Sequence, residues 1–219
     1  MMAWRLAASC CAALLTSLHA QAADFALYPT GPAQDSAFIR FINATAAPLE
    51  VSAAQGQPLR LDASAPASLF FPVQAGNSIK GTLVSGQQKR AVDVSIEPGE
   101  FATVIALPDA TQVTVREQPD DFNGLKASLA FYSVDASCAD ASLRPAGRTA
   151  DLFKAVPTGT LQRRSINPVS LSVQLVCGGA HVGAPMDLGE LKAGERYSVL
   201  LVPSAAGPHL LSATDTLSH

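Results

Sequence analysis

The sequence predicts an all-β protein built from two tandem β-sandwich domains that are related by internal duplication. Short apolar alternations, separated by Gly-, Pro- and Asn-containing turns every 8 to 12 residues or so, are typical of a sandwich. No helical period competes with them. Two pairs of similar segments then recur in the same order along the chain, which indicates that one domain has been duplicated.

The segment Ser36–Asn43 anchors this duplication. In an extended strand, successive side chains point to opposite sides, so Ala37, Ile39 and Phe41 share one face. Lys126–Ser133 repeats this pattern with an offset of 90, placing Ala127, Leu129 and Phe131 at the same positions. Gly99–Pro108 and Gly194–Pro203 match with an offset of 95. Chance likeness between two β-rich halves is the alternative to duplication.

Residues 1–22 are interpreted as a secretory signal peptide, because Arg5 precedes an apolar run, Leu6–Leu18, that is followed by the small residues Ala20 and Ala22. This run is too short for a permanent anchor, and no other stretch reaches about 18 uninterrupted apolar residues. We therefore expect an exported protein without stable membrane insertion. The lead-in from Ala23 to Asp35 contains prolines that disfavour a helix.

The N-terminal sandwich is expected over residues 23–117. After Ser36–Asn43, its predicted strands are Leu49–Ala53, Leu59–Asp62, Ser68–Pro72, Ser78–Val84, Arg90–Ile96, Phe101–Leu107 and Gln112–Glu117. The strand Phe101–Leu107 is apolar on both faces, so a loop, the lead-in or the neighbouring domain should cover its outer side.

A polar, turn-rich linker is predicted over residues 118–124, followed by the C-terminal sandwich over residues 125–219. Asp151–Val156 is ambiguous between a strand and a helical turn, and the polar tail Thr214–His219 is expected to be frayed. The predicted strands are Ala127–Val134, Ser142–Arg144, Ala150–Val156, Leu161–Ile166, Val169–Val176, Met186–Leu191, Arg196–Val202 and His209–Ala213.

Two cysteines remain after removal of the signal peptide, Cys138 and Cys177. An exported chain with one such pair favours a disulfide. Cys177 has the parity of Val173 and Leu175, so it should point toward the core and be able to reach a facing strand. Two buried free thiols are the alternative.

The charge balance and the titratable residues exclude several functions. The chain has 15 Lys and Arg against 18 Asp and Glu, a net charge of −3, and nothing in this balance attracts a nucleic acid. His181, His209 and His219 lack metal-ligand spacing, and no Gly-x-Ser-x-Gly elbow accompanies them. We therefore expect no cofactor, no metal and no catalytic residue, and we interpret the chain as a binding or assembly module.

Direct glycan binding has limited support. Sugar-binding sandwiches stack rings on exposed aromatic side chains, yet the only Trp, Trp4, lies in the signal peptide. Tyr28 is one candidate contact for a partner or a glycan. Arg163 and Arg164 form a basic pair that is a second candidate, although such pairs are more often solvated turns or edges.

Five segments together carry a family resemblance: Leu27-Tyr28, Pro32, Ser36–Arg40 leading to Asn43, Ile166–Val169 and Leu191–Glu195. They resemble the exported alginate biosynthesis protein AlgF, over essentially the whole mature chain. These motifs are structural ones, so they point to the family and to no particular site. The cysteine pair departs from the family's usual pattern.

The resemblance implies a periplasmic, non-catalytic component of an exopolysaccharide O-acetylation apparatus. In such systems a membrane-bound O-acyltransferase passes acetyl groups outward, and periplasmic O-acetyltransferases of the Ser-His-Asp type modify the polymer. The polymer is open, since similar proteins accompany cellulose acetylation as well as alginate acetylation. We expect a scaffold that docks these enzymes. The alternatives are a carbohydrate-binding module that holds the polymer near them, and an acetyl carrier or acetyltransferase.

Overall fold

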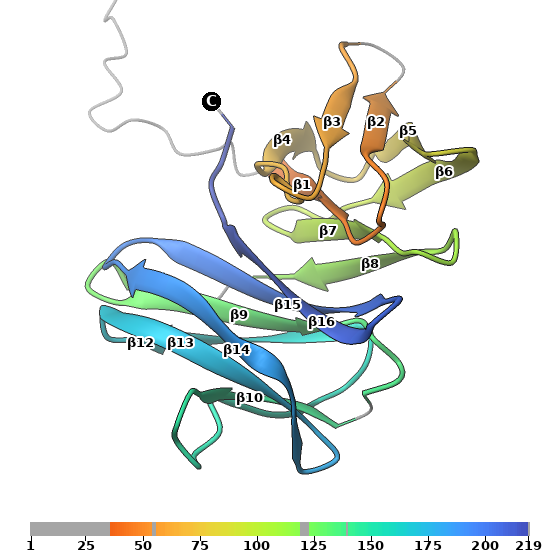
Figure 1. The fold of residues 1–219 in the computed structure, drawn as a ribbon. Helices are drawn as coiled ribbons and strands as arrows, with labels where there is room; N and C mark the ends of the chain where they lie inside the picture. Colours follow the sequence, from red (N-terminus) through yellow and green to blue (C-terminus); the bar gives the residue numbers. More distant parts are fainter. Residues whose placement is uncertain (1–35, 54–55, 119–122, 139, 219) are drawn as a thin grey trace, which may run out of the picture. The chain divides into compact units, whose positions relative to one another are not determined.

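The structure is a computed structural model, and it describes residues 36–53, 56–118, 123–138 and 140–218. Every regular element in these residues is a β-strand, so no helix able to cross a bilayer occurs among them (Figure 1). The strands are β1 Ser36–Asn43, β2 Leu49–Ala53, β3 Leu59–Leu61, β4 Phe71–Gln74, β5 Ser78–Ser85, β6 Gln88–Ser95, β7 Phe101–Ala106, β8 Gln112–Glu117, β9 Ala127–Ser133, β10 Ala141–Pro145, β11 Phe153–Val156, β12 Thr160–Ile166, β13 Val169–Cys177, β14 Ala180–Leu191, β15 Arg196–Ser204 and β16 Gly207–Thr214.

The strands form four sheets that make two sandwiches with the same topology. The N-terminal sandwich has the orders β4-β1-β7-β8 and β3-β2-β5-β6. The C-terminal sandwich has the orders β12-β9-β15-β16 and β11-β10-β13-β14, which are the same two orders with eight added to every strand number. The predicted all-β fold of two tandem sandwiches is confirmed.

The strand register supports internal duplication residue by residue. β1 and β7 are parallel, with Phe38 opposite Phe101. β9 and β15 are also parallel, with Ser128 opposite Arg196. These partners differ from Phe38 and Phe101 by the offsets of 90 and 95 that the sequence matches show. The two likenesses in sequence therefore come from strands that pair with each other in the same way in both halves.

The backbone bonds that start these strand pairs repeat as well. The Gly99 N–H donates to the Ser36 carbonyl at 2.8 Å, and the Gly194 N–H donates to the Lys126 carbonyl at 2.9 Å. Both glycines have positive φ, 75° and 78°, which a side chain would disfavour. The Gly-Glu motif thus marks a tight turn that sets the register of the following strand in each half.

Each sandwich has its own apolar core, and a third apolar cluster joins the two. The N-terminal core includes Ile39, Leu83 and Val104, and the C-terminal core is built around Phe131 and other residues of the second half. The third cluster consists of Ile42, Ile105, Leu107, Val115, Ala130, Tyr132, Val134, Leu200 and Val202. The outer face of β7 is therefore covered by the neighbouring sandwich, which is one of the three covers that the sequence allowed.

The structure corrects three expectations about local elements. Residues 153–156 form strand β11, so the helical-turn alternative for Asp151–Val156 is wrong. β4 begins at Phe71 and not at Ser68. β14 begins at Ala180, six residues before the predicted start, because Gly178 and Gly179, with φ of 56° and 84°, form a two-residue hairpin loop directly after β13.

The C-terminal tail is held by backbone hydrogen bonds to Phe70, which its polar sequence does not predict. The Phe70 N–H donates to the Thr216 carbonyl at 2.9 Å, and the Ser218 N–H donates to the Phe70 carbonyl at 2.8 Å. The expectation of a frayed tail is therefore wrong for residues 214–218. The predicted signal peptide, residues 1–22, and most of the predicted linker lie outside the described residues.

Candidate functional site

The described histidines give no sign of a catalytic or metal centre. His181 lies on β14 and His209 on β16, and both are exposed. Within the ranges that the structure describes, no group of three His, Cys, Asp or Glu side chains is placed to hold a metal ion. Two other features of the described residues are candidates for function: an apolar pocket and the polar joint between the sandwiches.

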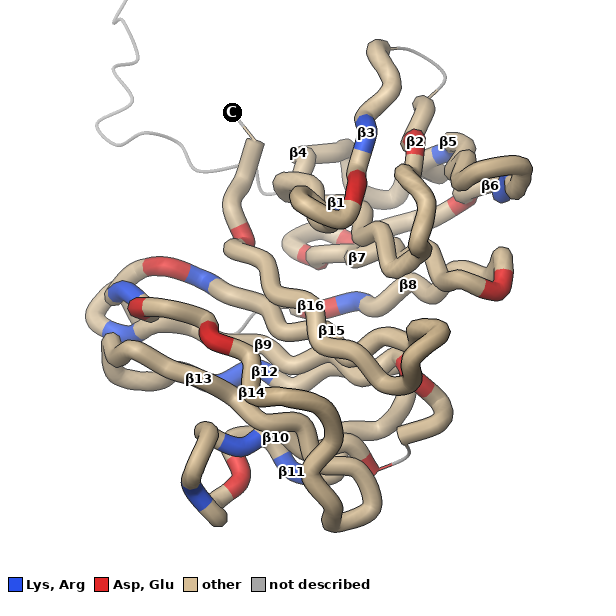
Figure 2. The backbone as a smooth tube through the Cα atoms, in the orientation of Figure 1, with Lys and Arg blue, Asp and Glu red and all other residues tan. Residues whose placement is uncertain are grey.

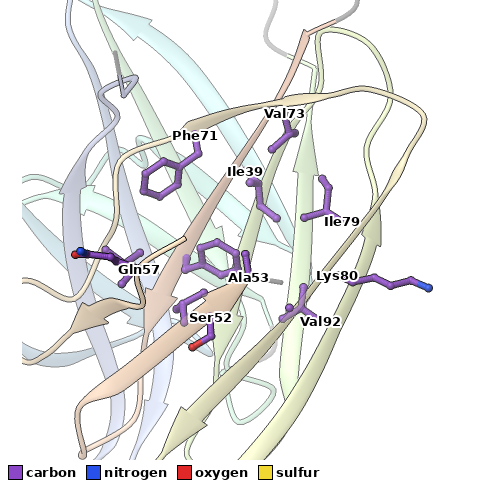
Figure 3. Close-up of a pocket in the computed structure, with 13 residues that line it drawn as sticks. Ile39, Ser52, Ala53, Gln57, Phe71, Val73, Ile79, Lys80 and Val92 are labelled. Atoms are coloured by element: carbon purple, nitrogen blue, oxygen red, sulfur yellow. The ribbon is translucent and has the colours of Figure 1, made fainter. Parts of the chain in front are cut away.

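An apolar pocket of about 230 Å³ opens between the two sheets of the N-terminal sandwich (Figure 3). The period-two alternation of β1 directs Ile39 and Phe41 into it. Figure 3 shows Phe71 on one side, Ile79 on the other, and Lys80 extending away from the pocket. The remaining lining residues are Val51, Ser52, Ala53, Gln57, Leu59, Val73, Gly81 and Val92.

Short edge strands leave the pocket open at the side. β3 has three residues and β4 has four, and each lies at the end of its sheet. Polar side chains come from Ser52, Gln57 and Lys80 alone among the lining residues. A sugar ring would lose hydrogen bonds to water here without replacing them, whereas an apolar side chain would gain contact. The pocket therefore suits an apolar group.

The joint between the sandwiches contains a buried ionic network centred on Arg40 of β1. Figure 2 shows where Lys, Arg, Asp and Glu residues lie along the backbone. The Arg40 side chain is fully buried and donates to Asp215 Oδ1 at 2.6 Å, to Ser198 Oγ at 2.9 Å and to Thr103 Oγ1 at 3.0 Å. Its guanidinium also lies 4.4 Å from the centroid of the Phe70 ring. A buried charge is stable only with such a full set of partners.

A second arginine extends this network from the other half. Arg163 of β12 donates from Nη2 to Asp215 Oδ2 at 2.9 Å and to Glu117 Oε2 at 3.0 Å. Glu117 lies opposite Phe101, and the Asp215 N–H bonds to the Arg196 carbonyl, so the two acids follow equivalent strand pairs. Phe101 and Arg196 correspond by the offset of 95. The joint therefore brings two equivalent acids, Glu117 and Asp215, together at Arg163.

The charges of the network fix the pKa of Asp215. Burial by itself raises the pKa of this carboxyl group, but attraction to Arg40 and Arg163 and a hydrogen bond from Ser198 outweigh it, so the pKa is lowered. Burial likewise opposes the charge of Arg163, yet Glu117 and Asp215 raise its pKa. Asp215 and Arg163 are therefore charged at neutral pH and form an ion pair with each other.

The residues predicted as sites have different environments. Cys138 and Cys177 form a disulfide with a Cα–Cα distance of 5.2 Å, as predicted. Tyr28 lies outside the described residues. Arg163 has 13% of its side chain exposed, and its guanidinium forms ion pairs with Glu117 and Asp215. Arg164 is exposed, and its Nη1 donates to the Leu152 carbonyl at 2.7 Å.

Arg40, Asp215 and Glu117 are not among the predicted site residues. One signal was present, because Arg40 interrupts the otherwise apolar run Ala37–Ile42. A charge in such a strand needs a buried partner. The partner Asp215 is 175 residues away, so no local pattern could have paired them.

Comparison with protein families identifies the family of this chain. A family model described as "Alginate O-acetyl transferase AlgF" matches residues 11–198. The chain belongs to the AlgF family. The resemblance inferred from the sequence is thereby confirmed, and AlgF membership supports a role in alginate O-acetylation.

Solved structures show weaker likeness. The C-terminal domain of AlgF from P. aeruginosa is 23% identical over 41% of this chain and 98% of that chain, with a TM-score of 0.35. The Bacillus anthracis TIE protein is 11% identical over 76% of this chain and 34% of that chain, with a TM-score of 0.26. At these TM-scores neither likeness bears on what this AlgF-family chain does. A comparison with curated proteins found no match.

Proposed function

We propose that this AlgF-family chain is a non-catalytic accessory protein of the periplasm, which acts as a scaffold in the O-acetylation of an exopolysaccharide, alginate or cellulose. Its partners are the periplasmic polysaccharide O-acetyltransferases and the membrane-bound O-acyltransferase that supplies them. It supplies no nucleophile of its own and needs no cofactor. Its contribution is to hold the enzymes in position.

This proposal rests on the observation that the buried charged side chains at the joint bond to one another. Arg40, Asp215, Arg163 and Glu117 bond to one another in the joint between the sandwiches, where they hold two rigid bodies together. The pocket between the two N-terminal sheets, in contrast, is lined mostly by apolar side chains, which can take part in binding but not in acyl transfer. Charged groups that bond within the chain, together with an accessible apolar pocket, are expected of a protein that docks partners.

The disulfide Cys138–Cys177 supports the compartment. Structural disulfides form and persist in oxidising environments such as the bacterial periplasm. A periplasmic position also places the chain on the same side of the membrane as the polymer-modifying enzymes named above.

Deleting the coding sequence tests the function. Acetyl esters on the polymer should be lost while polymer yield stays near the wild-type level, because a scaffold for acetylation does not act in polymerisation. The measurement is the ratio of released acetate to uronic acid or glucose, with complementation by the intact chain as the control. Loss of the polymer itself would contradict the proposal.

Calorimetry distinguishes the scaffold from a carbohydrate-binding module. Acetylated and bare oligosaccharides should give no binding heat with the purified chain, while a partner O-acetyltransferase should bind. Oligosaccharide binding without enzyme binding would replace the scaffold by a module that holds the polymer.

A further inference from the structure

The duplication supplies a reference for the apolar pocket, because every lining strand has a counterpart in the C-terminal sandwich. Val51 lies opposite Leu59 in the pair β2–β3, and Leu143 lies opposite Phe153 in the pair β10–β11. Phe41 of β1 corresponds to Phe131 of β9 by the offset of 90. The place of the pocket can therefore be examined in both halves.

In the C-terminal sandwich this place is filled by the chain itself. Phe153 is 2% exposed and its ring lies 5.9 Å from that of Phe131, which is fully buried. In the N-terminal sandwich the smaller Leu59 stands at the position of Phe153, and both Leu59 and Phe41 remain half-buried. The N-terminal half thus has a smaller and less buried side chain at this position than the C-terminal half.

A second difference between the halves lies at Gly81 and also leaves the pocket open. Gly81 lies opposite Ala53, and by the β-hairpin registers its counterpart is Val173, which is fully buried. A Cβ on Gly81 would stand 2.8 Å from the Ser52 carbonyl oxygen, so this position cannot be filled without moving the backbone.

A third difference lies at the mouth of the pocket, where the N-terminal half is again more open than the C-terminal half. Phe71 pairs with Ile39 in the N-terminal half, and Arg164 pairs with Leu129 in the C-terminal half. Arg164 bonds across the opening to the Leu152 carbonyl beside β11, which closes the seam between the two edge strands. Phe71 has no donor with which to do this, and it adds apolar surface to the mouth instead.

We propose that the pocket is a docking site for one aromatic side chain carried by an extended segment of a partner protein. The C-terminal half shows the chemistry of the occupant, because there an aromatic side chain on an extended strand, Phe153 of β11, fills the equivalent place. Strands β3 and β4, each at the end of its sheet, flank the opening and offer backbone groups for an added strand. In identifying the partner as an acetylation enzyme, this inference rests on the proposed scaffold function.

The substitution Leu59→Phe tests the site with the residue that the other half already uses. It should fill the pocket without disturbing the fold. Leu125→Phe is the matched control, since Leu125 is 81% exposed and does not line the pocket. In a deletion strain, Leu59→Phe should give at least tenfold less polymer acetylation than Leu125→Phe at equal protein level. Equal acetylation with the two variants would overturn the proposal.

A binding measurement separates the pocket from the scaffold function. N-acetyl-L-phenylalaninamide, used as the probe, should shift the NMR methyl signals of Val51, Ile79 and Val92 in the wild-type chain, and N-acetyl-L-alaninamide should not. The Leu59→Phe variant should lose these shifts. Absence of any shift overturns the pocket even where the deletion abolishes acetylation, which leaves the scaffold standing.

If the deletion leaves acetylation unchanged, the scaffold function fails, and the phenylalaninamide titration alone decides whether the pocket takes an aromatic group. Light scattering covers one other occupant. A dimer that Leu59→Phe dissociates would assign the pocket to a second copy of the chain and would overturn docking of a different protein.

Discussion

The N-terminal and C-terminal sandwiches share every strand pairing, yet different side chains occupy equivalent positions in the two. The C-terminal sandwich closes its seam with Phe153 and Arg164, whereas the N-terminal sandwich leaves a pocket there. At this seam one copy of the duplicated fold is filled by its own side chains, while the other keeps an accessible apolar site. Function can be located by asking where two copies of one fold differ.

A second difference concerns the connection between the first two strands of each half. In the C-terminal sandwich, Cys177 at the end of β13 is joined to Cys138 in that connection by a disulfide. In the N-terminal sandwich, Ser85 at the end of β5 has its hydroxyl 2.8 Å from that of Thr45. A covalent link in one half replaces a hydrogen bond in the other, so the C-terminal half should be the more resistant to unfolding.

The largest effect is expected at the joint, where the two sandwiches depend on each other. Asp215→Ala leaves Arg40 buried without its main partner, and removal of one member of a buried ion pair costs about 3–5 kcal/mol. Urea unfolding should therefore show a large loss of stability. Asp140→Ala is the matched control, because Asp140 is an exposed aspartate of the same half. A loss for Asp215→Ala no greater than for the control would contradict the central place of the network.

The disulfide should contribute almost as much. Replacing Cys138 and Cys177 by serine removes the constraint on a loop whose ends are 39 residues apart, which corresponds to about 4 kcal/mol of chain entropy in the unfolded state. Hydrogen exchange should report the loss mainly in β9–β16. Equal loosening of β1–β8 would show that the two halves unfold as one unit.

Phe153→Leu should open a pocket in the C-terminal half by giving it the residue found in the N-terminal half. Lost burial and the remaining cavity should cost about 1–2 kcal/mol. Thermal unfolding measures this loss, and N-acetyl-L-phenylalaninamide should then bind the new cavity. A variant that keeps full stability and binds no amide would mean that Phe153 does not fill this place.

The smallest effect depends on pH. The pKa of Asp215 is lowered in the folded chain, so its ionic bonds stabilise the fold above the ordinary aspartate value of 3.8, and the stabilisation is lost as the pH falls through the lowered value. The difference in unfolding free energy between the wild type and Asp215→Asn should be constant near neutral pH and should shrink below about pH 4. A difference that grows in acid would contradict this sign.

Much of the fold follows from local pattern. The alternation in Ser36–Asn43 predicts β1, and its repetition in Lys126–Ser133 predicts β9 and the duplicated architecture. The predicted start of β14 lies six residues late, because Ala180–Pro185 shows no clear apolar alternation, although Gly178-Gly179 before it is a hairpin turn of the shortest kind.

The site could not be predicted in the same way. The pocket depends on the volumes of side chains from strands far apart in the sequence, such as Leu59 and Gly81, and no single stretch reveals a missing one. The pairing of Arg40 with Asp215 likewise arises only when the two sandwiches meet. A polar tail gave no hint that its one aspartate would be buried.

Acetylation by a chain without histidine tests the central claim, that this protein organises acetyl transfer without performing it. His181, His209 and His219 are the histidines outside the predicted signal peptide, and a nucleophilic serine of the usual kind needs one of them as its base. The account predicts that a variant with all three replaced by glutamine restores the acetyl content of the polymer in the deletion strain to the wild-type level. Loss of acetylation with this variant, at a normal amount of folded protein, would contradict it.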